Sequence, residues 1–181
     1  VMRETEGQKD SPCTRIGRAP VLFLYDLCLS IFLVIGFPFL WRRIRPDRRY
    51  PGDWRERFGR YPEAVERGAG RRIWIHAVSV GELLAVSGLI QTIGERYEGE
   101  VVLTVTTRTA RLVAARQFPS LPCVFFPVDI GPVVRKAFAA IRPRTIILVE
   151  TELWPRLLVE ASSRKIPVVV VNGRISPSSF R

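Results

Sequence analysis

The sequence predicts an α/β domain built on a Rossmann-like parallel sheet. Five runs rich in β-branched and aromatic residues alternate with four segments that have the apolar spacing of helices. The strand runs are almost continuously apolar, which indicates burial on both faces and hence helices on each side of a parallel sheet. A chain of 181 residues with 47% hydrophobic and 25% charged residues has the composition of a globular protein with a substantial core.

The amino-terminal part of the chain predicts a flexible leader followed by a membrane-anchor helix. Residues 1–20 mix charges with Gly, Pro and Ser and show no periodicity. Residues 21–41 contain one charge, Asp26, and as a helix they would extend roughly 31 Å, about the thickness of the hydrocarbon layer. A buried or interfacial amphipathic helix is the alternative, favoured by Asp26, Gly36 and Pro38. The sequence leaves open whether this helix would span the bilayer fully or insert into it only partly.

A basic juxtamembrane segment, residues 42–71, comes next and carries much of the net charge of +11. Such a charge predicts an anionic partner, either nucleic acid, a membrane surface or a phosphorylated substrate. The arginines crowd beside the apolar segment rather than along the later strands, which disfavours nucleic acid and favours the cytoplasmic side of a membrane. Three widely spaced cysteines indicate a reducing compartment and no zinc site.

The α/β pattern occupies residues 72–181. The expected strands are residues 72–78, 101–106, 122–128, 144–150 and 167–172. The expected helices between them are residues 82–97, 110–118, 131–141 and 153–165. Neither a G-x-G-x-x-G fingerprint nor a P-loop occurs, so the sequence does not support a glycine loop that cradles phosphate.

Two acidic residues are expected at the carboxyl edge of the sheet, where parallel α/β proteins bind ligands. Glu82 follows the first strand at the start of a helix, and Glu150 ends the strand "TIILVE". An acid at the rim of a buried strand has a raised pKa unless a cation or a hydrogen-bond donor lies beside it. These two carboxylates are therefore the candidate functional groups.

Structural roles explain the same residues equally well. Ser79 and Glu82 form an S-x-x-E capping box, which typically contributes about 0.5–2 kcal/mol, and spacing alone favours this role. Glu150 could pair with an arginine of this basic chain. His76, the only histidine, is expected to be a packed core residue or to support the site indirectly. From pattern alone, the chain is a membrane-anchored α/β domain with two candidate carboxylates.

Five motifs occur in the order and spacing of one enzyme family. The motifs are "WRERFG" (54–59), "HAVSVGE" (76–82), "FPVDI" (126–130), "VETELWP" (149–155) and "VNGRIS" (171–176). Over residues 21–181 the chain resembles the amino-terminal half of the 3-deoxy-D-manno-octulosonic acid (Kdo) transferases. The resemblance implies a GT-B glycosyltransferase fold, in which this half holds the acceptor. It also implies a second, nucleotide-binding domain, which the sequence ending at Arg181 lacks, so this chain alone is expected to be inactive.

The resemblance also implies roles for individual residues. Glu82 is similar to the general base of an inverting transfer, and Glu150 to the residue that stabilises the transition state. The implied substrate-binding residues are Ser79, Gly81, Glu152 and Arg174. The implied reaction uses neither metal nor cofactor and moves Kdo from CMP-Kdo to a lipid A precursor in lipopolysaccharide synthesis. The implied location is the cytoplasmic side of the inner membrane.

Two other readings stay open. One is a GT-B transferase with a different sugar or acceptor. The other is a non-catalytic, membrane-anchored module that binds acidic lipid through the eight arginines between Arg42 and Arg60. The number of Kdo residues transferred is not specified by these patterns.

Overall fold

The computed structural model describes residues 18–43, 53–66, 72–97, 101–150 and 154–172. The chain forms two compact units, residues 1–42 and 43–181, which we describe separately.

In the described part of the first unit lies one helix, α2 (Arg18–Arg43), over the residues where the sequence predicts a membrane-anchor helix. Within the described ranges, no helix is both long enough and apolar enough to cross a membrane. Residues 21–41 are helical as predicted, and their role as a membrane anchor stays a prediction. Asp26 interrupts the apolar stretch and arginines occupy both ends of α2. Eight large apolar side chains of α2, from Val21 to Ile35, are exposed.

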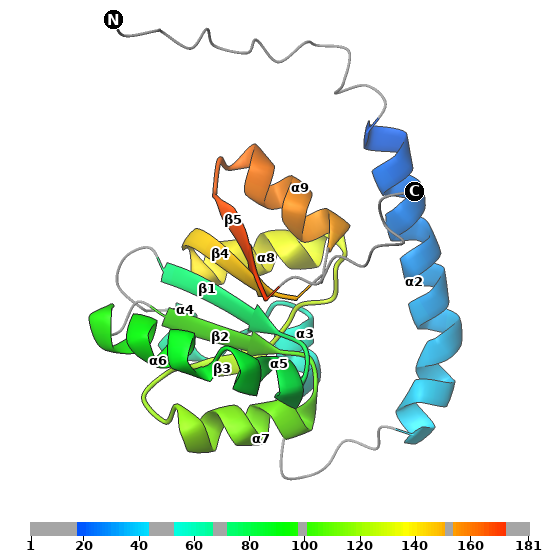
Figure 1. Cartoon of the computed structure of the whole chain (residues 1–181). Coiled ribbons are helices and arrows are strands. Elements are labelled where there is room, and N and C mark those ends of the chain that lie inside the picture. The colour runs from blue at the N-terminus through cyan, green and yellow to red at the C-terminus, as the bar shows by residue number, and fades with distance from the viewer. Residues whose placement is uncertain (1–17, 44–52, 67–71, 98–100, 151–153, 173–181) are drawn as a thin grey trace, which may run out of the picture. The chain divides into compact units, whose positions relative to one another are not determined.

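The second unit is built on a five-stranded parallel sheet with the order β3-β2-β1-β4-β5 (Figure 1). The strands are β1 (Arg72–Ala77), β2 (Val101–Val105), β3 (Cys123–Phe125), β4 (Pro143–Val149) and β5 (Val168–Val171). The α/β class and the parallel sheet predicted from the alternating pattern are confirmed. Each of the five expected strands exists, with bounds that differ by at most three residues at either end.

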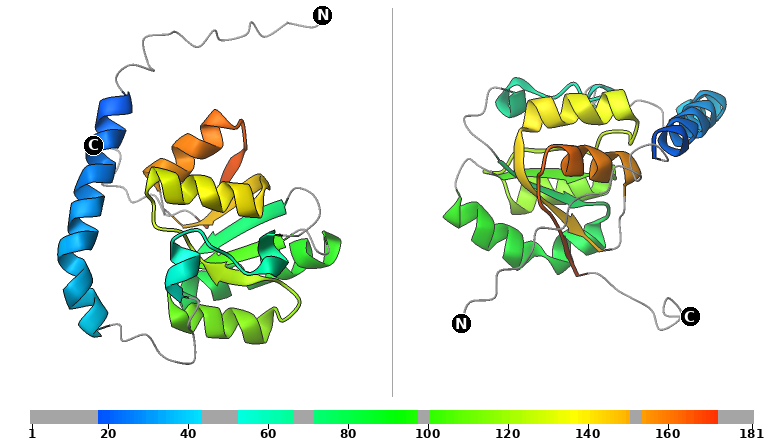
Figure 2. Two further views of the ribbon diagram at one scale, coloured as in Figure 1. Left: turned by 180° about the vertical axis from the view of Figure 1, so that it is seen from behind. Right: turned by 90° about the horizontal axis from the view of Figure 1, so that it is seen from above.

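Helices cover both faces of the sheet. The elements are α3 (Asp53–Arg57), α4 (Glu63–Glu66), α5 (Val80–Ala85), α6 (Ser87–Arg96), α7 (Arg108–Gln117), α8 (Gly131–Ile141) and α9 (Pro155–Ser163). Helices α5 to α7 lie on one face, whereas α8 and α9 lie on the other (Figures 1 and 2). This two-sided cover explains why the strands are apolar without alternation.

Successive side chains of each strand enter different cores, as the pleat requires. On β1, Trp74 packs in the core under α8 and α9, whereas Ile75 packs in the core under α5 to α7. Trp74 is fully buried and its Nε1 donates a hydrogen bond of 2.8 Å to Thr104 Oγ1 on β2. The tryptophan therefore brings its polar atom into the core with a partner.

The basic segment before β1 packs against the sheet through a buried ion pair. Glu56 on α3 is 4% exposed and accepts bonds of 2.6 and 2.9 Å from both terminal nitrogens of Arg111. The same carboxylate accepts a 2.8 Å bond from the backbone amide of Phe125 on β3. The guanidinium groups of Arg57 and Arg111 also lie over the Phe125 ring. These contacts cover the edge strand β3 and limit pairing with other chains.

Two expected elements differ from the structure. The helix expected over 82–97 is divided at Val86, whose backbone (φ −111°, ψ 15°) is not helical. Val86, Ser87 and Gly88 are all weak helix formers, which explains the break. The strand expected over 122–128 ends at Phe125, which is paired with Val105, the last residue of the partner strand β2.

Candidate active site

The candidate site lies where the sheet changes direction. Strands β1 and β4 are parallel neighbours with His76 opposite Leu148, yet β2 and β3 continue to one side and β5 to the other. Such a switch point leaves a crevice at the carboxyl ends of the two central strands. Glu82 lies in the first turn of α5, just after β1, and Glu150 directly follows β4. The structure thus brings both predicted carboxylates to one edge, on neighbouring strands.

Glu82 is 8% exposed and is held by two donors. The Val78 amide donates to Oε2 at 2.7 Å, and the Ser79 hydroxyl donates to Oε1 at 2.8 Å. The Glu82 amide in turn donates to Ser79 Oγ at 3.3 Å, which caps α5. The capping role is therefore confirmed, but the side chain binds the Val78 amide instead of the expected Ser79 amide.

Gly81 leaves open space beside this carboxylate. A Cβ built on Gly81 would meet only Ser79 Oγ, at 3.9 Å, and the backbone φ of Gly81 is not positive. Neither packing nor backbone geometry within the described residues therefore requires glycine here. A glycine in a helix costs about 0.5–1 kcal/mol relative to alanine, so helix stability does not explain the residue either.

Glu150 has a left-handed backbone conformation, with φ 62°. A residue other than glycine costs about 1–2 kcal/mol in this region, and such strain gathers at functional sites. The Glu150 amide donates a 2.8 Å bond to Val171 O on β5, which fixes the backbone at this point. Its side chain is partly exposed, unlike the buried strand that precedes it.

His76 lies beneath the same edge and is fully buried. Its Nδ1 lies 3.1 Å from both Thr104 O and Thr104 Oγ1, and its ring stacks on Phe126 at 3.9 Å. A bond to the carbonyl assigns the proton to Nδ1, so Nε2 is an acceptor, without a partner among the described residues. Burial lowers the pKa of His76 to about 3, although the bond to Thr104 opposes this shift. A neutral, packed imidazole agrees with the supporting role expected from the sequence.

Long-range contacts hold the start of α9 (Pro155–Ser163). Asp129 is 2% exposed, and its two carboxylate oxygens accept 2.9 Å bonds from the Arg156 and Leu157 amides at the start of α9. Trp154, the residue before α9, packs on Phe126 with ring centroids 5.0 Å apart and on His76 at 6.3 Å. Sequence reasoning noted the "FPVDI" motif but assigned no role to Asp129.

Two predicted substrate-binding residues, Glu152 and Arg174, lie outside the described residues. Sequence reasoning also missed the pairing of Glu56 with Arg111, although "WRERFG" contains one partner. In the ranges that the structure covers, no group of three or more His, Cys, Asp or Glu side chains could hold a metal ion.

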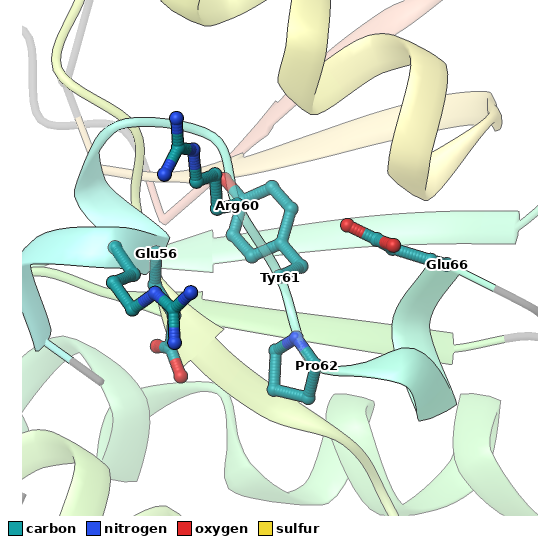
Figure 3. A pocket seen from close by; sticks show the side chains of 6 residues that line it. Glu56, Arg60, Tyr61, Pro62 and Glu66 are labelled. Atoms are coloured by element: carbon teal, nitrogen blue, oxygen red, sulfur yellow. The ribbon is translucent and has the colours of Figure 1, made fainter. Parts of the chain in front are cut away.

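A hollow of about 400 Å³ lies elsewhere, lined by Arg55, Glu56, Arg60, Tyr61, Pro62 and Glu66 (Figure 3). None of the predicted site residues borders that hollow.

Comparison with known proteins assigns a family to this arrangement. Residues 52–181 match the family described as 3-deoxy-D-manno-octulosonic-acid transferase. The chain is 37% identical over 143 residues to a probable mitochondrial 3-deoxy-D-manno-octulosonic acid transferase of Arabidopsis thaliana, covering 78% of this chain and 31% of the relative. It is 34% identical over 168 residues to the transferase of Bordetella pertussis, covering 87% and 38%. For the transferase of Haemophilus influenzae the identity is 33% over 134 residues, covering 72% and 31%. The chain thus spans between 31% and 38% of the length of these relatives.

Proposed function

Because the chain belongs to the 3-deoxy-D-manno-octulosonic acid (Kdo) transferase family, we propose that it forms the acceptor-binding part of an inverting GT-B glycosyltransferase. The donor would be CMP-Kdo and the acceptor a lipid A precursor, as in lipopolysaccharide synthesis. One observation carries the proposal: two carboxylates, Glu82 and Glu150, follow neighbouring parallel strands at the switch point of the sheet. A nucleotide-binding domain outside this chain would supply the donor site.

Glu82 is the proposed general base. The acceptor hydroxyl oxygen attacks the anomeric carbon of Kdo, the new C–O bond forms as the bond to the CMP phosphate breaks, and the hydroxyl proton passes to the base. An ionised carboxylate has about four lone-pair sites, and two are used by Val78 and Ser79. An acceptor hydroxyl can therefore bind Glu82 without breaking the helix cap. Capping and catalysis are compatible roles for this side chain.

Glu150 is the proposed electrostatic stabiliser. The sugar passes through a state with oxocarbenium character, which a nearby carboxylate favours by its negative charge. Its strained backbone supports this role, because strain at the end of a strand is expected where function fixes the geometry. Ser79, Gly81, Glu152 and Arg174 are proposed to contact substrate, and the reaction is proposed to need neither metal nor cofactor.

We also propose that the enzyme works at the cytoplasmic surface of the inner membrane. The exposed apolar side chains of α2 support lipid contact, with Phe23, Phe32 and Ile35 between 67% and 73% exposed. A lipid acceptor would be reached most directly from such a position.

The proposal is tested with Glu150→Gln in the full-length protein that contains this chain. Transfer from CMP-Kdo to a bisphosphorylated lipid A precursor should fall by about 10²–10³-fold, the scale expected for lost electrostatic stabilisation. The control is Glu95→Gln, since Glu95 is exposed in the last turn of α6 and accepts a bond from Gln91. Because α6 leads into β2, Glu95 lies near the amino edge of the sheet, so this variant should keep full activity. Equal turnover in both variants would rule out the role of Glu150.

A further inference from the structure

One of the two donors that hold Glu82 lies just beyond the end of a strand. Strand β1 ends at Ala77, and the next amide, of Val78, donates to Glu82 Oε2 at 2.7 Å. Strand β2 ends at Val105, and the next amide, of Thr106, donates to Val78 O at 3.3 Å. The position of the Glu82 carboxylate therefore depends on how the segments after β1 and β2 are held together.

The Thr106 carbonyl group is held by a donor from a remote segment. Helix α7 is capped by Thr107, whose carbonyl accepts the first helical bond, from the Arg111 amide, at 3.1 Å. The Thr106 carbonyl precedes this position and so lies outside the helical hydrogen bonds. Its donor is Arg57 on α3, 49 residues away in the sequence, whose Nη2 binds Thr106 O at 2.5 Å.

Arg57 is itself fixed by its surroundings. Its backbone carbonyl accepts a 2.8 Å bond from the Val128 amide, and its guanidinium group lies over the Phe125 ring, 4.4 Å from the centroid. Phe125 is 1% exposed, and its amide binds the buried Glu56 carboxylate at 2.8 Å. The guanidinium group therefore reaches Thr106 from a rigid support, with little side-chain freedom left to lose.

We propose that Arg57 is a positioning residue of the transferase, which fixes the Val78 amide against the Glu82 carboxylate by holding Thr106. The inference rests on the proposed role of Glu82 as the general base. Arg57 acts through two successive backbone groups and is not proposed to contact the reacting atoms. A misplacement of about 1 Å at a reacting centre can lower a rate by about a hundredfold, so loss of this support should be visible in turnover.

Three variants separate the hydrogen bond from the other properties of Arg57. Arg57→Met removes the donor but keeps a long, unbranched side chain that can still pack on the Phe125 ring. Arg57→Lys keeps the positive charge and an amine donor, but not the planar guanidinium group. The matched control is Arg116→Met, the same chemical change at an exposed position in the last turn of α7.

The first experiment needs no substrate and measures amide hydrogen exchange by NMR in this chain. In Arg57→Met, the Thr106 and Val78 amides should exchange about tenfold faster or more, because the arginine no longer holds the segments that carry them. In Arg57→Lys the increase should be smaller. The Leu83 amide, bonded to Ser79 O at 3.1 Å, reports whether α5 persists, and its exchange should not change. Arg116→Met should leave these amides as they are.

The second experiment is a double-mutant cycle in the full-length enzyme. Arg57→Met should lower kcat by about ten- to a hundredfold and Arg57→Lys by less, whereas Arg116→Met should keep full activity. In the Glu82→Gln background, Arg57→Met should have almost no further effect, because the carboxylate that it positions is already gone. In the Glu150→Gln background its effect should remain in full. A merely structural role would give the same factor in both backgrounds.

The outcomes separate the two proposals. Unchanged exchange at Thr106 and Val78, equal factors in the two backgrounds, or an Arg57→Met chain that fails to fold would each overturn the positioning role. An Arg57→Lys enzyme as impaired as Arg57→Met would also overturn it, because a retained donor would then have no value. A Glu82→Gln enzyme with full turnover would instead overturn the proposed role of Glu82, and the exchange data would still report whether Arg57 holds the two segments.

Discussion

Replacing Glu82 by glutamine separates its two roles, the helix cap and the proposed base. Glutamine has nearly the same shape, and its oxygen can accept from the Val78 amide, now bonded at 2.7 Å. Its NH2 group can donate to the Ser79 hydroxyl, which now donates to the carboxylate at 2.8 Å. Both contacts can therefore persist, but neither is assisted by a negative charge.

The cost in stability follows from these two bonds. A hydrogen bond to a charged group contributes about 1 kcal/mol more than a neutral one, and the helix dipole adds about 0.3–1 kcal/mol. Glu82→Gln should therefore lower the free energy of unfolding by about 1–3 kcal/mol and Tm by about 3–10 °C. A protein with about 5–15 kcal/mol of stability stays almost entirely folded after such a loss.

The expected cost in rate is far larger. A general base typically contributes about 10²–10⁴-fold, and glutamine cannot take a proton. The assay measures Tm and transfer from CMP-Kdo to the lipid acceptor on the same preparation of full-length enzyme. Ser79→Ala is the comparison variant, because it removes the cap hydroxyl but keeps the carboxylate. It should lose about 0.5–2 kcal/mol of stability, and because Ser79 is also proposed to contact substrate, its loss should raise KM, whereas kcat should fall far less than in Glu82→Gln.

Two results would refute this reasoning. Near-full turnover in Glu82→Gln, with Tm lowered as expected, would show that the side chain is only a cap. Equal losses of turnover in Glu82→Gln and Ser79→Ala would show that activity follows the cap geometry and not the carboxylate.

Three further predictions concern the pH dependence of stability, the buried ion pair and the apolar helix. The pKa of His76 is about 3 in the folded state and near 6.5 in the unfolded state. The unfolded state therefore binds the proton more readily, and the free energy of unfolding should fall as the pH drops from 6.5 towards 3. The fall should be at most about 1.4 kcal/mol per pH unit. Denaturation of His76→Gln should lack this component, and an unchanged slope would contradict it. Arg111→Leu leaves the Glu56 carboxylate buried without its cation and should lower the free energy of unfolding, measured in urea, by about 2–4 kcal/mol. Arg116→Leu, at an exposed site of α7, should lower it by about 0.5 kcal/mol or less. Equal losses in the two variants would contradict the importance of the buried pair. A chain without residues 1–41 should bind anionic vesicles weakly and lose that binding in high salt, and equal binding to neutral vesicles would contradict the electrostatic part of this expectation.

The sheet could be predicted from the sequence because its signals are local. Each strand is a short apolar run, and each helix has its own periodicity, so elements and their alternation are readable within about ten residues. The break of the expected helix at Val86 is hard to predict, because weak propensity over Val86, Ser87 and Gly88 is a small local effect. The early end of β3 coincides with the end of its partner strand β2 at Val105, which the apolar run of β3 itself does not specify.

The site was only partly predictable. The S-x-x-E spacing correctly indicated the cap formed by Ser79 and Glu82, since both partners lie within one turn. The partner amide, Val78, depends on the conformation that leaves β1, which spacing does not specify. The left-handed backbone of Glu150 has no sequence signal, because residues other than glycine are rarely found there.

Contacts between remote segments could not be predicted. Glu56 and Arg111 are 55 residues apart, and Asp129 lies 27 residues from the amide of Arg156 that it accepts from. Only the order of strands brings these residues together, and the alternation of strands and helices does not specify that order. In such a basic chain, many arginines were equally suitable partners for any one carboxylate.

The pairing of β1 with β4 has a consequence for how new specificities could arise in such enzymes. Parallel neighbours lie about 4.8 Å apart, and this spacing depends on backbone hydrogen bonds rather than on side chains. Glu82 lies at the start of α5 and Glu150 directly after β4, so in the proposed enzyme insertions beyond these residues could reshape an acceptor crevice while both carboxylates keep their places beside the central strands. Divergence in substrate would then proceed through loop length and composition, with the two central strands inherited almost unchanged.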